Sequence, residues 1–176
     1  WVLELERHGL TAEWTHLLSN RLVLIVPVGN PAGVGRATDL TGDRVKIVAL
    51  AGESVPVGRY AEDALSSAGV YRRLMTEGRL ARGSNSRSTL AFVEVGEADA
   101  GVVYLTDALA SGRVEIVEVI EHVLHSPIGY PVALLSAAAN DDRARLLYEF
   151  LQSEAAARVF YEHGFFTSFF GDATGF

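Results

Sequence analysis

One stretch in the middle of the chain, from Gly83 to Tyr104, has the sequence GSNSRSTLAFVEVGEADAGVVY. Ser84 is a favourable N-cap for a helix that ends near Gly96, because serine oxygens accept hydrogen bonds from free helix-start amides. The residues from Ala100 to Tyr104 then form a short, buried strand that ends in a tyrosine. A helix that passes directly into a buried strand favours an α/β fold.

The same alternation continues on both sides of this stretch. Further buried strands are predicted at Arg21–Pro27, Val45–Leu50, Val114–Ile120 and Ile128–Leu135. Further helices are predicted at Val2–Gly9, Val57–Ala68, Asp141–Gln152 and Glu154–His163. Alternating strands and helices predict an α/β fold with a largely parallel sheet.

The composition narrows the possible functions. The 176 residues are 49% apolar and carry a net charge of −7, and no basic block offers a surface for nucleic acid. The absence of cysteine excludes disulfides, thiol catalysis and cysteine-ligated zinc. No apolar run approaches the roughly 18 residues that a membrane span needs. The chain has no Walker or GxGxxG motif and no histidine–carboxylate metal spacing, so we expect no cofactor and no free metal ion.

The joint between the second strand and its helix is the first candidate site. Pro56 suits the first turn of a helix, and Gly58 has no side chain to shield its neighbours. Amide groups near Val57 would then point out of the helix start, where the helix dipole favours an anion. The alternative is an ordinary turn.

Two further features repeat this chemistry. The joint from Gly83 to Arg87 offers a second helix start, although a simple Ser84 cap explains it as well. Arg87 could add charge beside an anion or pair with Glu94 or Glu97. Tyr104 ends a strand, where ligands of open α/β sheets gather, so its hydroxyl could donate to an oxyanion. The alternative is a core tyrosine with a satisfied hydroxyl.

In this order, the stretches resemble the periplasmic molybdate-binding proteins, the substrate-binding components of molybdate ABC importers. The resemblance covers nearly the whole chain. The matching stretches are RLVLIVP (Arg21–Pro27), VPVGRYAEDAL (Val55–Leu65), GSNSRSTLAFVEVGEADAGVVYLTDAL (Gly83–Leu109), PIGYPVALL (Pro127–Leu135) and FLQSEAAARVFYEHGF (Phe150–Phe165).

The resemblance implies a fold like the type II periplasmic binding proteins, with two α/β lobes joined by a hinge and the ligand in the cleft. Residues 1–21 would be a remnant of the first lobe, and residues 22–127 a complete second lobe. Residues 128–176 would return to the first lobe, with the C-terminal helices and an aromatic tail. The resemblance also implies a periplasmic or extracytoplasmic location and a membrane permease of the ABC type as partner.

In that family a tetrahedral dianion is held by backbone amides and hydroxyls without a counter-ion. Carried over by position, Val57 and Ser86 would contribute backbone N–H groups and Tyr104 its hydroxyl. Gly58 and Arg87 would support the site. The ligand would be molybdate or tungstate, and no bond would be made or broken, so the chain would not be an enzyme.

One departure from the family pattern affects function. The part of the family's first lobe that carries its anion-contacting serines has no counterpart in this sequence, so we expect an incomplete first lobe and weak anion binding. Its helices would expose apolar side chains at Leu146, Leu147, Phe150 and Phe160. A partner chain, a swapped element or the aromatic tail would cover them, and self-association is one such outcome.

Two alternative functions use the same fold. The chain could be the oxyanion-sensing regulatory domain of a transcription factor. It could also be a transferase on phosphorylated substrates, which would need a general base or a nucleophile in the cleft. The sequence supplies no such residue at the candidate site.

Overall fold

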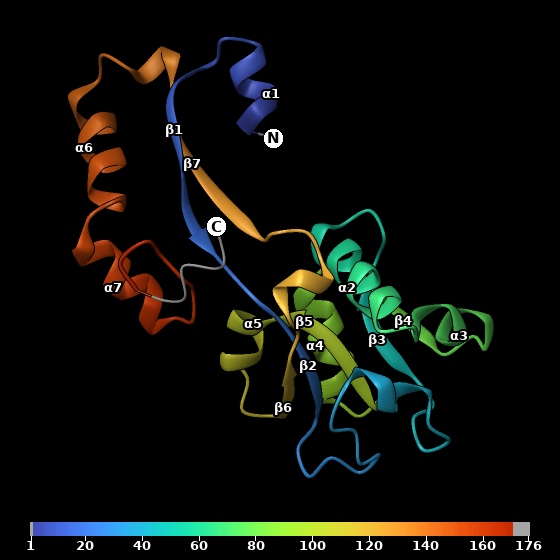
Figure 1. Cartoon of the computed structure of the whole chain (residues 1–176). Helices are drawn as coiled ribbons and strands as arrows, with labels where there is room; N and C mark the ends of the chain where they lie inside the picture. Colours follow the sequence, from blue (N-terminus) through green and yellow to red (C-terminus); the bar gives the residue numbers. More distant parts are fainter. Residues whose placement is uncertain (1, 171–176) are drawn as a thin grey trace. The chain divides into compact units, whose positions relative to one another are not determined.

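The structure of the protein is a computed structural model that describes residues 2–170 (Figure 1). The chain divides into two compact units. Unit 1 consists of Trp1–Asn20 together with Pro127–Phe176, and unit 2 is the continuous segment Arg21–Ser126. Each unit has its own sheet, which confirms the predicted α/β fold class.

Unit 2 is built on a five-stranded sheet with the order β4-β3-β5-β2-β6. Its strands are β2 (Leu22–Pro27), β3 (Val48–Ala51), β4 (Leu80–Gly83), β5 (Ala100–Tyr104) and β6 (Val114–Val119). β3 pairs in parallel with β4 and β5, whereas β2 runs antiparallel to both β5 and β6. Four strands therefore share one direction and β2 opposes them. The prediction of a largely parallel sheet holds for strand direction but not for the two pairings of β2, because an apolar run shows that a strand is central without showing how its neighbours run.

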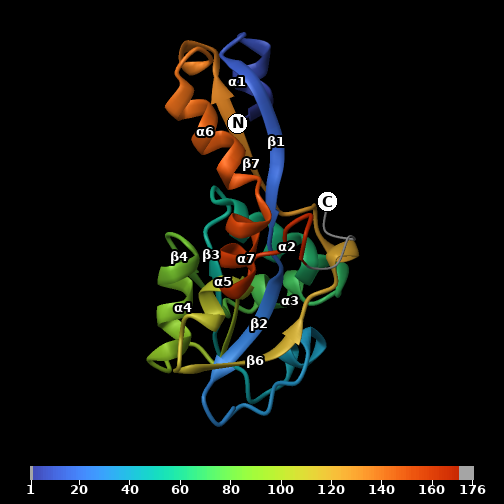
Figure 2. The ribbon, with the colours of Figure 1, turned by 90° about the vertical axis from the view of Figure 1, so that its left-hand side faces the viewer.

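Helices cover both faces of this sheet (Figure 2). They are α2 (Pro56–Ser67), α3 (Tyr71–Thr76), α4 (Ser86–Glu94) and α5 (Leu105–Leu109), with short 3-10 turns at Ala37–Thr41 and His122–Leu124. Leu90 and Val93 of α4 pack with Val23, Ile25 and Val103 in one buried cluster. The buried side chains of α2 lie outside that cluster and contact β2, β3 and β5. The two layers fix the starts of α2 and α4 against the sheet.

Unit 1 contains a two-stranded antiparallel sheet of β1 (Thr11–Ser19) and β7 (Gly129–Leu135), which lie side by side in Figure 1. Its helices are α1 (Val2–Arg7), α6 (Asp142–Leu151) and α7 (Glu154–Glu162), with a 3-10 turn at Ser136–Ala138. The paired residues run from Thr11 opposite Leu135 to Ser19 opposite Gly129. β1 was not predicted, because its charged and apolar residues follow no period of two.

The aromatic segment after α7, residues 165–170, packs against other parts of unit 1. The Phe165 ring meets Tyr130 edge-on with their centroids 5.6 Å apart, and Phe170 lies 5.6 Å from the Tyr161 ring. The Ser19 amide donates to the Phe166 carbonyl at 2.9 Å. Of the three covers expected from sequence, a partner chain, a swapped element and the aromatic tail, this agrees with the third, because residues 165–170 fold back. Residues 171–176 of the tail lie outside the described residues. Within residues 2–170, no helix has the length and apolar character to cross a bilayer.

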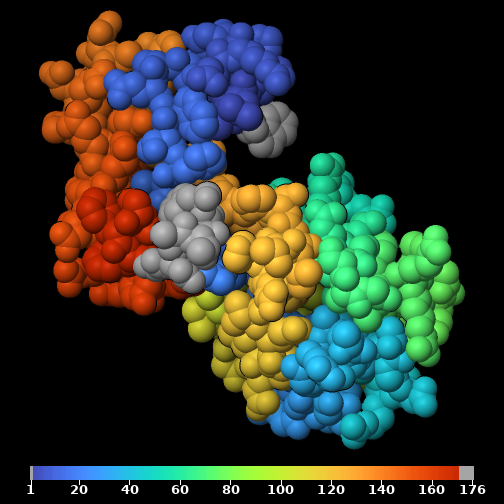
Figure 3. Space-filling view, viewed as in Figure 1, coloured from blue at the N-terminus to red at the C-terminus, as the bar shows by residue number. Residues whose placement is uncertain are grey.

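The outer face of α6 remains apolar in spite of this packing. Leu146, Leu147 and Phe150 are 64%, 57% and 56% exposed, and the surfaces of α6 and α7 are visible in orange and red in Figure 3. Phe160 differs from expectation, because it is half-buried against the segment that follows α7. The three α6 residues are the most exposed large apolar side chains among the described residues of unit 1.

Candidate functional site

The candidate site lies at one edge of the unit 2 sheet. β3, β4 and β5 run parallel, so their carboxyl ends meet at the same edge. The chain leaves β3 to begin α2, leaves β4 to begin α4, and ends β5 at Tyr104. The last residues of β3 and β4, Ala51 and Gly83, are directly paired. The fold therefore brings the three predicted stretches to one edge.

The start of α2 leaves one amide available. Val55 is the N-cap in an extended conformation, and Pro56 occupies the first turn. The amides of Gly58 and Arg59 both donate to the Val55 carbonyl, at 3.0 and 3.3 Å. The Val57 amide donates to no acceptor within residues 2–170. It is one of the first-turn N–H groups that a helix itself cannot satisfy, so a ligand oxygen can take this position.

Glycine at position 58 is required by space. A Cβ atom there would lie 2.2 Å from the Gly52 carbonyl oxygen and 2.6 Å from the Ala51 carbonyl oxygen. Both are backbone atoms at the end of β3, which cannot move aside as a flexible side chain could. Gly58 therefore allows the first turn of α2 to approach the end of β3 closely. This is a packing role, and the predicted support of a bound anion by Gly58 stays a prediction.

The start of α4 is held by a reciprocal cap. The Ser88 amide donates to the Asn85 side chain at 2.9 Å, and the Asn85 amide donates to the Ser88 hydroxyl at 3.0 Å. The predicted cap, Ser84, is therefore wrong by one residue. Both residue types cap well, so sequence alone could not choose between neighbours. The Ser86 amide, one residue after the cap, donates to no acceptor within the described range.

Two hydrogen bonds tie the three strand ends together. The Gly52 amide, just after β3, donates to the Gly83 carbonyl at the end of β4 at 2.8 Å. The Tyr104 amide donates to the Ser86 hydroxyl at 3.5 Å. The first bond joins the ends of β3 and β4, and the second joins the start of α4 to the end of β5. Gly52 was not singled out from the sequence, where it is one of many loop glycines.

Tyr104 lies where β5 emerges from the core. The four residues before it, Ala100 to Val103, are fully buried, whereas Tyr104 is only half-buried. The burial of Tyr104 does not decide between the two interpretations made from sequence, so the donation of its hydroxyl to an oxyanion stays a prediction.

Arg87 lies mostly in solvent at the start of α4, and its predicted support of an anion stays a prediction. Its side chain is 90% exposed, and the nearest carboxylate oxygen belongs to Asp107, at 3.9 Å. Glu94, one of the two partners considered from sequence, instead pairs with Arg113 at 2.7 Å. An exposed pair at such a distance contributes little energy. Two further guanidiniums at this edge donate to backbone carbonyls, Arg82 to Ala51 at 3.0 Å and Arg59 to Glu53 at 3.1 Å.

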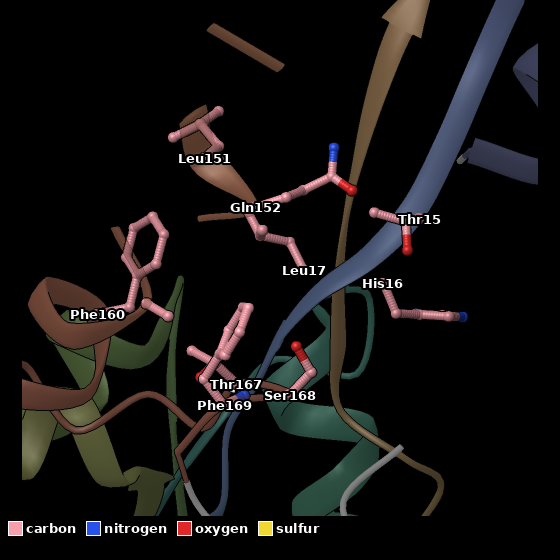
Figure 4. Close-up of a pocket in the computed structure, with 10 residues that line it drawn as sticks. Thr15, His16, Leu17, Leu151, Gln152, Phe160, Thr167, Ser168 and Phe169 are labelled. Atoms are coloured by element: carbon pink, nitrogen blue, oxygen red, sulfur yellow. Dashed lines mark hydrogen bonds between the residues drawn. The ribbon is translucent and has the colours of Figure 1, made fainter. Parts of the chain in front are cut away.

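A separate cavity of about 170 Å³ lies within unit 1 (Figure 4). In Figure 4, Leu151 and Gln152 come from the end of α6 and Phe160 from α7, while the His16 ring points away from the others. None of the predicted site residues lines it. Within residues 2–170, no group of three or more histidine, aspartate or glutamate side chains gathers to hold a metal ion.

The sheet and its covering helices give the chain an α/β fold like that of the periplasmic binding proteins. The comparison with known families agrees. The chain belongs to the family of bacterial extracellular solute-binding proteins, whose family model matches residues 1–166.

The chain is also similar in sequence to individual proteins of known function. The chain is 34% identical over 171 residues to the molybdate-binding protein ModA of Haemophilus influenzae, covering 94% of this chain and 66% of ModA. It is 33% identical over 162 residues to ModA of Escherichia coli, covering 88% of this chain and 61% of that protein. The chain thus spans about three fifths of these relatives' length.

Solved structures show the same fold. A protein described as the substrate-binding domain of a molybdenum ABC transporter from Clostridium difficile matches with a TM-score of 0.81 and 34% identity, over 94% of this chain and 72% of that one. The periplasmic molybdate-binding protein of Azotobacter vinelandii matches with a TM-score of 0.75 at 17% identity, over 93% and 73%. The second match is evidence for the fold alone.

Proposed function

We propose that this chain binds the molybdate or tungstate oxyanion through unit 2, as part of a solute-binding protein that delivers it to an ABC importer. The proposal is supported by the Val57 and Ser86 amides, which have no acceptor within residues 2–170 and which follow two adjacent parallel strand ends. Tyr104 ends the third parallel strand at the same edge. The names of the ModA relatives supply the identity of the anion. The membrane permease partner and the extracytoplasmic location follow from the same likeness.

Neutral donors are suited to such a ligand. A helix start presents aligned N–H groups and the positive end of its dipole to an anion. Each charge-assisted hydrogen bond is worth about 1.5–3 kcal/mol, so two amides and one phenol can give measurable binding. An anion that has no proton to donate needs no acceptor from the protein, and the Val57 and Ser86 amides offer only donors.

The 176-residue chain alone should bind weakly. The donors identified here all come from unit 2, so they would surround one side of a tetrahedral ion. Oxygen atoms on the other side would remain in water, and the dianion would keep much of its hydration. We therefore expect a dissociation constant well above the micromolar range.

Amide spectra suit weak binding. In ¹⁵N–¹H spectra of the chain, molybdate and tungstate should shift the Val57 and Ser86 amides in a saturable way, and sulfate should do so at higher concentration. Tyr104→Phe should weaken the molybdate response about tenfold, since it removes one charge-assisted bond. Tyr161→Phe is the matched control, because Tyr161 is an exposed tyrosine of unit 1. Sulfate binding as tight as molybdate, or micromolar molybdate affinity, would contradict the proposal.

The exposed face of α6 supports a second part of the proposal, self-association of this chain. Leu146 and Phe150 are four residues apart and form one apolar stripe with Leu147. Light scattering should show concentration-dependent dimers that Leu146→Glu with Phe150→Glu abolishes. A chain that stays monomeric at hundreds of micromolar would refute this part and leave anion binding unaffected.

A further inference from the structure

The side chain of Ser86 has a role that its amide does not explain. Ser86 is only 9% exposed, although it stands at the start of a helix beside exposed Ser84 and Asn85. Its hydroxyl oxygen accepts the Tyr104 amide at 3.5 Å. We propose that the Ser86 hydroxyl is a positioning group that holds the end of β5, and with it the Tyr104 phenol, in place relative to the α4 amides. This inference rests on the proposed function.

On the side that faces β3, the end of β5 extends beyond the registered strand pairing. The registered pairing of β5 with β3 covers only Ala100 and Gly101, so it stops before Tyr104. On the other side, Tyr104 lies opposite Leu22 of β2, and the amide of the next residue, Leu105, donates to the Arg21 carbonyl at 2.8 Å. The bond from Tyr104 to Ser86 therefore supplies a contact on the side that registered pairing with β3 does not reach.

The start of α4 is rigid enough to serve as the anchor. The Thr89 hydroxyl donates to the Asn85 carbonyl at 2.9 Å, in addition to the reciprocal cap between Asn85 and Ser88. Gly83 has no room for a side chain, because a Cβ atom would lie 2.5 Å from the Thr89 hydroxyl oxygen. A hydroxyl fixed to this turn can fix whatever it binds.

Neighbouring hydroxyls do not share this role. The Ser84 and Ser88 hydroxyls lie 3.2 Å from each other, and both contact Asn85. Only the Ser86 hydroxyl, among the serines of this joint, contacts β5. Ser86→Ala would remove that hydroxyl and keep the backbone amide, so it separates the two roles of the residue.

The first measurement needs no ligand. In the 176-residue chain, Ser86→Ala should speed hydrogen exchange of the Tyr104 amide about threefold to tenfold, as expected for loss of one hydrogen bond. Ser86→Thr, which keeps a hydroxyl, should restore slow exchange. Ser67→Ala removes a hydroxyl at the far end of α2 and is the matched control. Unchanged exchange in Ser86→Ala overturns the inference whether or not the chain binds anions.

The second measurement is a double-mutant cycle with sodium molybdate as the probe. Ser86→Ala should weaken molybdate binding about threefold to tenfold. In a Tyr104→Phe background the same change should weaken it less than twofold, because the hydroxyl acts through the phenol. A purely structural serine would lower stability and leave the affinity of the folded chain unchanged.

The outcomes separate the two proposals. If the unaltered chain shows no response to molybdate or tungstate, the proposed function fails, and the role of Ser86 in binding fails with it. If the unaltered chain binds and Ser86→Ala binds equally well, only the inference about Ser86 fails. Equal, additive losses in both backgrounds also overturn it, since they would mean that Ser86 acts independently of Tyr104.

Discussion

In unit 2, side chains such as Leu22, Leu50 and Val93 have no measurable exposure. Within residues 2–170, the largest fully buried apolar side chains all belong to this unit. In unit 1, Leu146 and Phe150 are more than half exposed on α6. The difference follows from the sheets, because five strands have two faces to cover and two strands have little face at all. A closed core like that of unit 2 is what can hold binding groups in fixed positions.

The largest test of this contrast is a pair of leucine truncations. Leu50→Ala in β3 should lower the free energy of unfolding by about 2–5 kcal/mol, since it leaves a cavity in a closed core. Leu146→Ala on α6 should change it by less than about 0.5 kcal/mol, as exposed substitutions do. Urea unfolding followed by circular dichroism measures both. Similar losses for the two variants would mean that α6 is covered in solution.

A glycine pair tests the close contact at the binding edge. Gly58→Ala should cost about 1–3 kcal/mol and suppress the molybdate response of Val57, because its Cβ would overlap the end of β3. Gly112→Ala is the control, since no atom lies within 4 Å of its added Cβ. Thermal unfolding measures the change in stability, and the amide titration measures the molybdate response of Val57. Normal binding by Gly58→Ala would show that the tight approach is unnecessary.

Helix caps in the two units allow a matched comparison. Asn85→Ala and Ser153→Ala each remove a side chain that accepts a first-turn amide, and each should cost about 1 kcal/mol. Only Asn85→Ala should also weaken molybdate binding, because Asn85 precedes Ser86. Equal effects on binding from both caps would argue against placing the site in unit 2.

The smallest expected effect is a change in how the folding stability depends on pH in the acid range. Hydrogen bonds from Arg79 and then Arg73 lower the pKa of Glu77, and hydrogen bonds from Arg143 lower the pKa of Asp141. A carboxyl whose pKa is lower in the folded state stabilises above its ordinary pKa, and this is lost as the pH falls through the folded value. Glu77→Gln in unit 2 and Asp141→Asn in unit 1 should therefore each flatten the loss of stability below about pH 4.5.

The two carboxyl variants can be assigned to their units by the choice of probe. Both tryptophans of the chain, Trp1 and Trp14, belong to unit 1. Asp141→Asn should therefore alter the acid transition seen by tryptophan fluorescence, and Glu77→Gln the one seen by circular dichroism alone. A steeper acid transition in either variant would contradict the direction of its pKa shift.

Most of the fold could be predicted from apolar runs and helix signals, and the exceptions have physical causes. β4 is four residues long with Arg82 inside it, so its composition gives no strand signal. Arg82 is accommodated there by the Ala51 carbonyl at 3.0 Å and the Tyr71 hydroxyl at 2.7 Å. β1 depends on its pairing with β7, a contact between distant segments that no local pattern encodes.

For the candidate site, the sequence predicted the positions of the residues but not the hydrogen bonds that join them. The starts of α2 and α4 could be located to within one residue, and the strand end at Tyr104 could be located as well, because local residue preferences set them. The links between them could not. The bond from Gly52 to Gly83 and the bond from Tyr104 to Ser86 join separate βα segments, so they follow from the order of strands in the sheet.

Two of the proposed donors at this edge belong to the main chain, at Val57 and Ser86. Every amino acid except proline carries the same amide, so evolution can exchange the letters at these positions, within the available volume, without erasing the chemistry. Homologous chains could thus drift apart in sequence and still recognise one anion. A survey that looks only for invariant side chains would pass over such a site.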